Sequence, residues 1–157
     1  MEVKPYLIGL TELVFPRSKP TMPKISKTFN FSMGHALNNY AGKCHDLHGH
    51  NYELIVCVEA AELDASGFVM DFGDLKKVVN DVLDNYGFDH CFRVCESDPR
   101  ADALSALGAT KMEAEPTAEN LILVLAKLIE AKLHNVTLAS LDLYETPTSQ
   151  AHWQQPL

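Results

Sequence analysis

Three histidines have a spacing that could bind a metal ion. His48 and His50 form a His-x-His pair, and His35 lies thirteen residues upstream of His48. If the pair lies in a β-strand, both rings point to the same face, because side chains alternate along a strand. Three neutral imidazoles leave the fourth coordination position of a zinc ion open to water or substrate, as in catalytic zinc sites. The pattern therefore predicts a catalytic zinc centre.

A lone His-x-His pair is a weak signal, because most such pairs are core or surface histidines that bind no metal. In this chain, however, four of the seven histidines fall within sixteen residues. The residues around them alternate in polarity as they do in neighbouring strands, so the three rings can meet across a strand pair. This clustering favours metal binding.

The four cysteines suggest different roles. Cys44 lies between the histidine segments and beside the positive charge of Lys43, which favours a reactive thiolate. Cys57 lies in a continuous apolar run and is expected to be a small core residue. Cys91 and Cys95 could form half of a structural zinc site, but no second Cys/His pair of matching spacing exists outside the histidine cluster. Cys44 is therefore the candidate nucleophile or base.

Length and composition are those of one soluble globular domain, with 157 residues, 46% hydrophobic and 22% charged. The net charge of −8 argues against a general attraction to nucleic acid or to an anionic membrane, so neither is expected as a partner. No apolar run is long enough to span a membrane, and the N-terminus lacks the apolar region of a signal peptide. The few cysteines are expected to be reduced thiols, which predicts a cytoplasmic protein.

Hydrophobic periodicity predicts the order of the secondary-structure elements. A Pro-punctuated extension at 1–24, with a possible short strand from Tyr6 to Leu10, precedes a single domain at 25–157. Within the domain, strands are predicted at about 25–35, 48–61, 68–70, 136–145 and 151–153. Helices are predicted after Asp71 and from Pro116 to about Leu133, and 93–115 is predicted to be a long loop with a short helix near 101–107.

This order of elements implies an α+β fold, in which an antiparallel sheet of about four strands carries two helices on one face. Such a sheet has two open edges, which natural proteins cover or pair with another chain. We therefore expect a symmetric homo-oligomer that assembles through its sheet edges.

A set of short motifs, in this order along the chain, resembles one known family. The motifs span about residues 25 to 153 and are His35, Cys44-x-x-x-His48-x-His50-Asn51-Tyr52, Met70-Asp71-Phe72, Asp89-His90, Pro116-Thr117-Ala118-Glu119-Asn120 and Glu145-Thr146. They resemble the 6-pyruvoyltetrahydropterin synthase and 6-carboxytetrahydropterin synthase family. The ordered set is far more specific than any one of its motifs.

This resemblance implies the tunnelling fold, in which subunits join their sheets edge to edge into a trimeric barrel and two trimers commonly stack into a hexamer. It also implies active sites at subunit interfaces that act on 7,8-dihydroneopterin triphosphate. Matched by position, the family's roles fall on His35, His48 and His50 as zinc ligands, Cys44 as general base, Asp89 and His90 as its partners, Glu145 as the pterin anchor and Thr117 as a pterin contact.

Each of these residue types suits the implied chemistry. Bound zinc acidifies hydroxyls of the substrate side chain, and the Cys44 thiolate can take a proton from a neighbouring carbon or return one. His90, oriented by Asp89, can exchange protons near neutral pH. The carboxylate of Glu145 can accept two N–H bonds from the pterin. Without the resemblance, Asp89-His90 would be an ordinary surface pair and Thr117 a helix N-cap.

The family contains two reactions that share this site. One forms 6-carboxy-5,6,7,8-tetrahydropterin with release of acetaldehyde and triphosphate, on the route to queuosine and other 7-deazapurines. The other eliminates triphosphate to give 6-pyruvoyltetrahydropterin for tetrahydrobiopterin. The spacing Cys44-x-x-x-His48 resembles the carboxy-forming branch, and His45 stands where a folate-directed variant usually has glutamate. A zinc-stabilised pterin-binding module is the non-enzyme alternative, and the presence of Cys44 argues against it.

Overall fold

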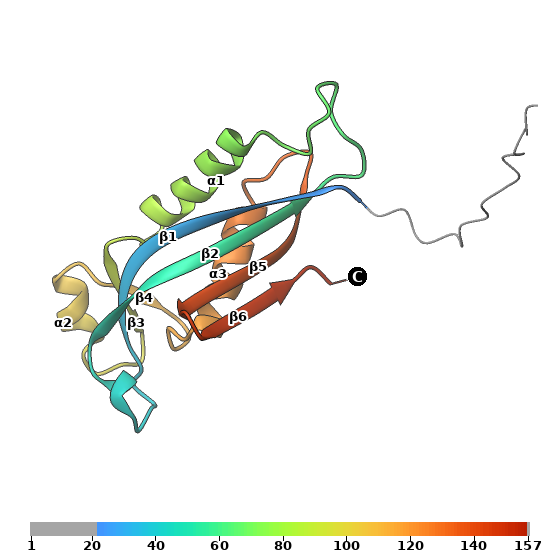
Figure 1. Ribbon diagram of the computed structural model, residues 1–157. Helices are drawn as coiled ribbons and strands as arrows, with labels where there is room; N and C mark the ends of the chain where they lie inside the picture. The colour runs from blue at the N-terminus through green and yellow to red at the C-terminus, as the bar shows by residue number, and fades with distance from the viewer. Residues whose placement is uncertain (1–21, 157) are drawn as a thin grey trace, which may run out of the picture.

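The computed structural model of the protein describes residues 22–156. In this part of the chain, six strands form one sheet in the order β4-β3-β1-β2-β5-β6 (Figure 1). The strands are β1 Lys24–Ala36, β2 His48–Glu59, β3 Cys91–Cys95, β4 Thr110–Met112, β5 Thr137–Thr146 and β6 Ser149–Gln154. The helices are the short 3-10 helix η1 Lys43–His45, α1 Phe72–Asn85, α2 Ala101–Ala106 and α3 Ala118–Glu130. The predicted α+β class is confirmed.

The long antiparallel pair of β1 and β2 carries the histidines. Its register places His35 directly opposite His48 and Met33 opposite His50. Along both strands, every second side chain is buried toward the helices, and the histidines continue this row at one end of the pair. The candidate metal ligands are therefore an extension of the core face of the sheet.

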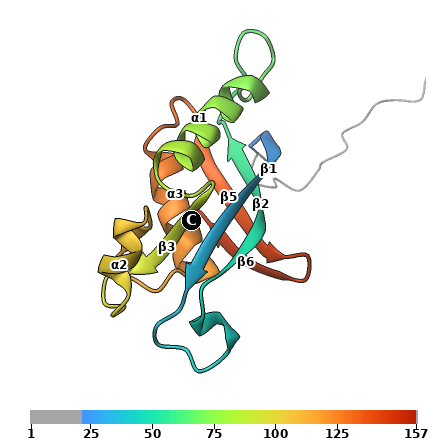
Figure 2. The same cartoon turned by 90° about the vertical axis from the view of Figure 1, so that its left-hand side faces the viewer.

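The two long helices lie on one face of the sheet, as predicted (Figure 2). Each begins at a side-chain cap that fixes its first residue. The carboxylate of Asp71 accepts hydrogen bonds from the backbone N–H groups of Gly73 and Asp74 at the start of α1. The hydroxyl of Thr117 accepts one from the N–H of Asn120 at the start of α3. These caps confirm the predicted helix starts.

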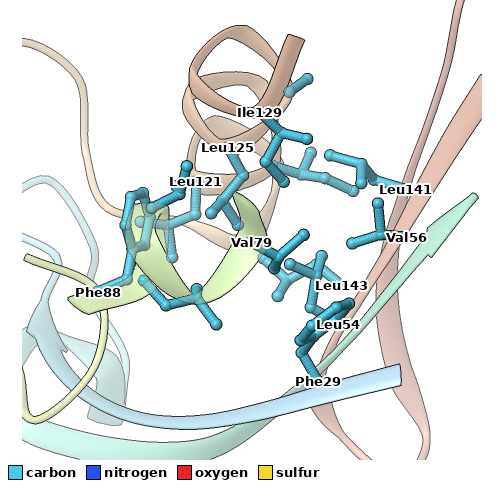
Figure 3. Packing of buried hydrophobic residues seen from close by; sticks show 14 of the residues in the cluster. Phe29, Leu54, Val56, Val79, Phe88, Leu121, Leu125, Ile129, Leu141 and Leu143 are labelled. Atoms are coloured by element: carbon cyan, nitrogen blue, oxygen red, sulfur yellow. The ribbon is translucent and has the colours of Figure 1, made fainter. Parts of the chain in front are cut away.

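The hydrophobic core fills the space between this sheet face and the helices (Figure 3). Most of its members come from β1, β2, β5, α1 and α3, and Phe88, Met112 and Ala151 join it from outside these elements. The members labelled in Figure 3 are Phe29, Leu54, Val56, Val79, Phe88, Leu121, Leu125, Ile129, Leu141 and Leu143. The three α3 residues recur every four positions, which places them on one stripe of the helix. This packing holds α3 against β5, and so fixes two elements whose ends carry candidate site residues.

The sheet is wider than the four antiparallel strands that the sequence predicts. Those four strands correspond to β1, β2, β5 and β6, but β3 pairs parallel with β1, and β4 pairs parallel with β3. The two extra strands have five and three residues, and they occupy part of the segment predicted to be a loop. Strands this short have no readable periodicity, so the sequence does not predict them. Their place in the sheet depends on where the chain emerges from α1.

The predicted strand at 68–70 is absent from the structure. The carboxylate of Asp64 accepts hydrogen bonds from the N–H groups of Ser66 at 2.8 Å and Phe68 at 2.9 Å. The N–H of Asp64 donates to the carbonyl of Phe68 at 2.9 Å. Because this turn uses both backbone polar groups of Phe68, neither can join a sheet ladder.

A single chain leaves the sheet open, with β4 and β6 at its edges. The predicted barrel therefore requires further chains and stays a prediction. The predicted strand from Tyr6 to Leu10 lies outside the described residues, as does most of the predicted extension at 1–24. Within residues 22–156, no helix is both long and apolar enough to cross a membrane.

Candidate metal centre and active site

The three predicted metal ligands meet in space. His35 is buried at 1% exposure, and His48 and His50 are half-buried beside it. One candidate ligand atom from each ring lies within 4.8 Å of the other two. Among residues 22–156 this is the one group of three or more His, Cys, Asp or Glu side chains with such an arrangement. Cys91 and Cys95 do not form a metal site in this part of the chain.

Backbone carbonyls fix which nitrogen of two rings carries the proton. Nδ1 of His35 lies 2.6 Å from the carbonyl oxygen of Pro116, and Nδ1 of His48 lies 2.8 Å from that of Asp46. A carbonyl oxygen can only accept, so each Nδ1 donates and each neutral ring presents an Nε2 lone pair. These two Nε2 atoms face one another at 3.0 Å. Two lone pairs at this distance repel unless a cation or a proton lies between them.

The third ring also presents a nitrogen without a partner. Among the described residues, Nε2 of His50 is the buried side-chain polar atom that has no hydrogen bond. Burial lowers the pKa of both His35 and His50, so protonation is a poor way to satisfy these atoms. A tetrahedral zinc ion with bonds of about 2.0–2.1 Å would hold its ligand nitrogens roughly 3.3–3.4 Å apart. The donor set therefore fits zinc.

Glu145 points toward the same cluster. Its Oε1 atom lies 3.5 Å from Nε2 of His35 and 3.8 Å from Nε2 of His50. The buried hydroxyl of Tyr52 donates a hydrogen bond to this oxygen at 3.2 Å. Burial, together with the negative charge of Glu145, raises the pKa of Tyr52, so the phenol keeps its proton and remains a donor. Tyr52 thus fixes the direction of the Glu145 carboxylate.

A cavity of about 250 Å³ joins four of the predicted site residues. His35, Cys44, Thr117 and Glu145 all line it, although they come from β1, η1, the start of α3 and the end of β5. Cys44 is half-buried and free. One chain therefore brings a candidate metal ligand, the candidate base and both candidate pterin contacts to one pocket.

Asp89 and His90 form a pair elsewhere on the chain. Nδ1 of His90 lies 2.9 Å from Oδ1 of Asp89, and this oxygen also accepts the N–H of Ser32 at 2.9 Å. Burial works against ionisation of Asp89, but the hydrogen bonds from Ser32 and His90 outweigh it and hold the pKa of this carboxyl below its ordinary value. The pair is thus an imidazole oriented by a carboxylate, and its catalytic role stays a prediction.

The position of this pair differs from that of Cys44. The His90 side chain is 83% exposed and lines a second cavity of about 360 Å³, together with Gly34, Gly49 and the candidate metal ligand His50, whereas Cys44 lines the first cavity. The backbone φ angle of His90 is 51°, a left-handed conformation that is costly for a residue other than glycine. The structure of one chain therefore does not bring His90 to the Cys44 cavity.

Some site groups escaped the sequence analysis. Tyr52 could have been identified, because it lies two residues after His50 and so points to the same face of the strand. The carbonyl groups of Pro116 and Asp46 had no signal, because every residue has a carbonyl and only the fold decides which ones a ring meets. These groups set the tautomers of two ligands, which is a known function of the partners of metal-binding histidines.

Solved structures share this fold. The crystal structure of an uncharacterized protein from Wolinella succinogenes matches with a TM-score of 0.74 and 22% identity, over 87% of this chain and 99% of that chain. A 6-pyruvoyl tetrahydropterin synthase from Caenorhabditis elegans matches with a TM-score of 0.66 and 23% identity, over 87% of this chain and 97% of that chain. These likenesses confirm the predicted tunnelling fold.

Sequence comparison narrows the fold to a family. The family model of 6-pyruvoyl tetrahydropterin synthase matches residues 24–156. The 6-carboxy-5,6,7,8-tetrahydropterin synthase of Haemophilus influenzae is 34% identical in an alignment 148 residues long, which covers 85% of this chain and 100% of the relative. A protein of the same name from Bacillus subtilis is 29% identical in an alignment 138 residues long, which covers 87% of this chain and 88% of the relative. The chain belongs to the 6-pyruvoyl tetrahydropterin synthase family, as the motifs predict.

Proposed function

We propose that the protein is a zinc-dependent 6-carboxy-5,6,7,8-tetrahydropterin synthase. It would convert 7,8-dihydroneopterin triphosphate and water to 6-carboxytetrahydropterin, acetaldehyde and triphosphate. The observation that carries this proposal is the single cavity lined by His35, Cys44, Thr117 and Glu145 beside the three-histidine cluster. The names of the curated relatives support the choice of product.

Two residues would bind and orient the pterin ring. Glu145 has a carboxylate directed by Tyr52, and it could accept the N–H groups of the amino-pyrimidine edge. Thr117 caps α3 through its hydroxyl and lines the same cavity, so it can contact the ring without leaving its place. Held in this way, the substrate side chain would extend toward the histidine cluster.

His35, His48 and His50 would hold the zinc ion, with the carbonyls of Pro116 and Asp46 fixing two of the rings. When bound, zinc supplies a positive charge that acidifies substrate hydroxyls and stabilises developing negative charge. The orphaned Nε2 of His50 and the opposed nitrogens of His35 and His48 are the features of this chain that support metal binding.

Cys44 would take or return the proton at carbon, and the Asp89–His90 pair would exchange protons with the thiol or a substrate hydroxyl. Because His90 lines a different cavity from Cys44 in one chain, we propose that a neighbouring subunit supplies the pair. The assembly would be a homo-oligomer built through the open sheet edges, specifically a hexamer made of two trimers. We expect it in the cytoplasm, where its cysteines stay reduced.

The test is to incubate the zinc-loaded protein with 7,8-dihydroneopterin triphosphate and identify the products. We expect acetaldehyde and triphosphate in equal amounts with 6-carboxytetrahydropterin. Formation of 6-pyruvoyltetrahydropterin without acetaldehyde would assign the chain to the other branch of the family. Absence of any turnover would favour a pterin-binding module and refute the proposed function.

Cys44→Ala is the matched control for this assay. We expect it to abolish turnover while zinc content and pterin affinity stay close to those of the parent, because the thiol is assigned to proton transfer alone. Loss of zinc in this variant would instead make Cys44 a metal ligand and contradict the assigned role.

A further inference from the structure

We propose that Glu115 and Arg100 are positioning residues that hold the loop carrying Cys44 in its place beside the metal-binding histidines. This loop comprises residues 37–47 between β1 and β2 and will be called the Cys44 loop. The inference rests on the proposed function for its catalytic consequence. Its structural basis is independent of that function.

Hydrogen bonds within the Cys44 loop join its first residue to its second half. The N–H of Leu37 donates to the carbonyl of Cys44 at 2.9 Å, and Nδ1 of His45 lies 3.2 Å from the carbonyl oxygen of Leu37. His45 thus braces the loop and is not a member of the three-histidine group. The loop packs little apolar surface, because Lys43 and His45 are exposed and η1 has no buried residue. Its position must therefore come from polar contacts with other segments.

Glu115 binds the first half of the Cys44 loop. One carboxylate oxygen accepts the backbone N–H of Asn38 at 3.0 Å. The other accepts the backbone N–H of Asn39 at 3.2 Å and its side-chain amide at 2.9 Å. These are charge-assisted bonds to a carboxylate, which are about twice as strong as neutral ones. A single side chain from a distant part of the sequence thus fixes two successive peptide groups of the loop.

Arg100 binds the second half. Its Nη1 atom donates to the carbonyl of His45, the residue after Cys44, at 3.0 Å. The guanidinium is itself held by the buried carboxylate of Asp98, through Nε at 3.0 Å and Nη2 at 2.7 Å. The ion pair with Asp98 raises the pKa of Arg100, and the nearby carboxylates of Asp46 and Glu115 act in the same direction. The donor that reaches the loop is therefore both charged and fixed in direction.

Both anchors come from the segment that joins β3 to α3. In this segment, Glu115 is followed directly by Pro116, whose carbonyl holds the ring of His35, and by Thr117, which lines the cavity. Three consecutive residues thus contact the Cys44 loop, a metal ligand and the substrate cavity. A rigid connection of this kind fixes Cys44 relative to His35, which proton transfer at a carbon atom requires. We infer that this segment fixes the position of the Cys44 thiol relative to the metal-binding histidines.

The experiment compares Glu115→Gln and Arg100→Lys with the parent. Gln keeps the size of Glu115 but loses its charge and one acceptor oxygen. Lys keeps the charge of Arg100 but cannot hold the Asp98 carboxylate and the His45 carbonyl in one planar fork. Arg100→Ala is unsuitable, because it would leave the buried Asp98 carboxylate unpaired. Glu130→Gln, an exposed position in α3, is the control for the loss of one negative charge.

Two measurements that need no enzyme activity report on the Cys44 loop. The first is hydrogen exchange of the peptide covering residues 37–47, read by mass spectrometry. We expect it to be at least about tenfold faster in Glu115→Gln, with exchange in α1 unchanged. The second is alkylation of Cys44 by iodoacetamide, followed on the Cys44 peptide. We expect it to be at least about threefold faster in both variants, because a released loop opens the thiol to the reagent. Glu130→Gln should match the parent.

Steady-state kinetics with 7,8-dihydroneopterin triphosphate test the catalytic consequence. We expect kcat to fall at least about tenfold in Glu115→Gln while KM stays within about threefold, because Glu145 and Thr117 are untouched. Unaltered exchange and alkylation, or faster exchange throughout the chain, would overturn the positioning role. An inactive parent would refute the proposed function instead, and exchange and alkylation would still decide the role of Glu115 and Arg100.

Discussion

The metal centre can be tested by a substitution with opposite effects on the zinc-free and zinc-loaded protein. His50→Leu removes the buried Nε2 atom that has no partner and replaces the ring by an apolar side chain of similar size. A buried polar atom without a hydrogen bond costs about 1–3 kcal/mol. The ring centroid of His50 lies 5.7 Å from that of Tyr52, so the new side chain has a core residue to pack against. We expect the zinc-free variant to be more stable than the zinc-free parent by about 1–2 kcal/mol.

Zinc should reverse this order. A ligand at one hundred times its dissociation constant stabilises a protein by about 2.7 kcal/mol. For a chain of this length, 1 kcal/mol corresponds to roughly 2–4 °C in Tm. Zinc should therefore raise the Tm of the parent by about 5–11 °C, and His50→Leu should lose most of this gain because only two ligand rings remain. The assay is thermal denaturation followed by circular dichroism, with and without a zinc excess.

His48→Leu is the matched control. It also removes one ligand, but it breaks the hydrogen bond from Nδ1 to the carbonyl of Asp46, so its zinc-free form should gain no stability. A zinc-free His50→Leu less stable than the parent by 1 kcal/mol or more would refute the reasoning. That result would mean that Nε2 of His50 is satisfied without a metal.

Three further predictions follow from the same contacts. Burial lowers the pKa of His35 from its ordinary value of 6.5. On acidification, His35 therefore takes up a proton more readily in the unfolded chain than in the folded one. The free energy of unfolding of the zinc-free protein, measured by urea denaturation, should thus be highest above pH 6.5 and fall below it by up to about 1.4 kcal/mol per pH unit. A rise in this free energy on acidification would contradict the burial of His35. Gly87→Ala adds a Cβ 2.4 Å from Thr110 at a φ of 70° and should lower the free energy of unfolding by about 2 kcal/mol in the same assay. Gly67→Ala, at a φ of 85° in open space, should lower it by about 1 kcal/mol. Equal losses would exclude the clash with Thr110. Glu145→Gln should weaken the binding of sepiapterin to the zinc-loaded protein at least about tenfold with unchanged zinc content, as measured by titration; unaltered affinity would place the pterin anchor elsewhere.

Much of the fold could be predicted because its signals are local. The alternation in β1 and β2, the caps at Asp71 and Thr117, and the apolar stripes of α1 and α3 depend on neighbouring residues, which the sequence contains directly. The three histidines belong to the same class, since strand parity alone puts His48 and His50 on one face. The short parallel strands β3 and β4 could not be predicted, because five and three residues are too few to show a periodicity.

The sequence by itself determined which residues are candidates for binding zinc and transferring protons, because residue type and strand parity are properties of the chain. Only the tertiary structure decided how those residues are held. The carbonyl of Pro116 behind His35, the direction that Tyr52 gives to Glu145, and the separation of His90 from the Cys44 cavity all join segments that are distant in sequence. Hydrogen bonds of this kind depend on where packing places a backbone group, and the sequence of either segment alone does not contain that information.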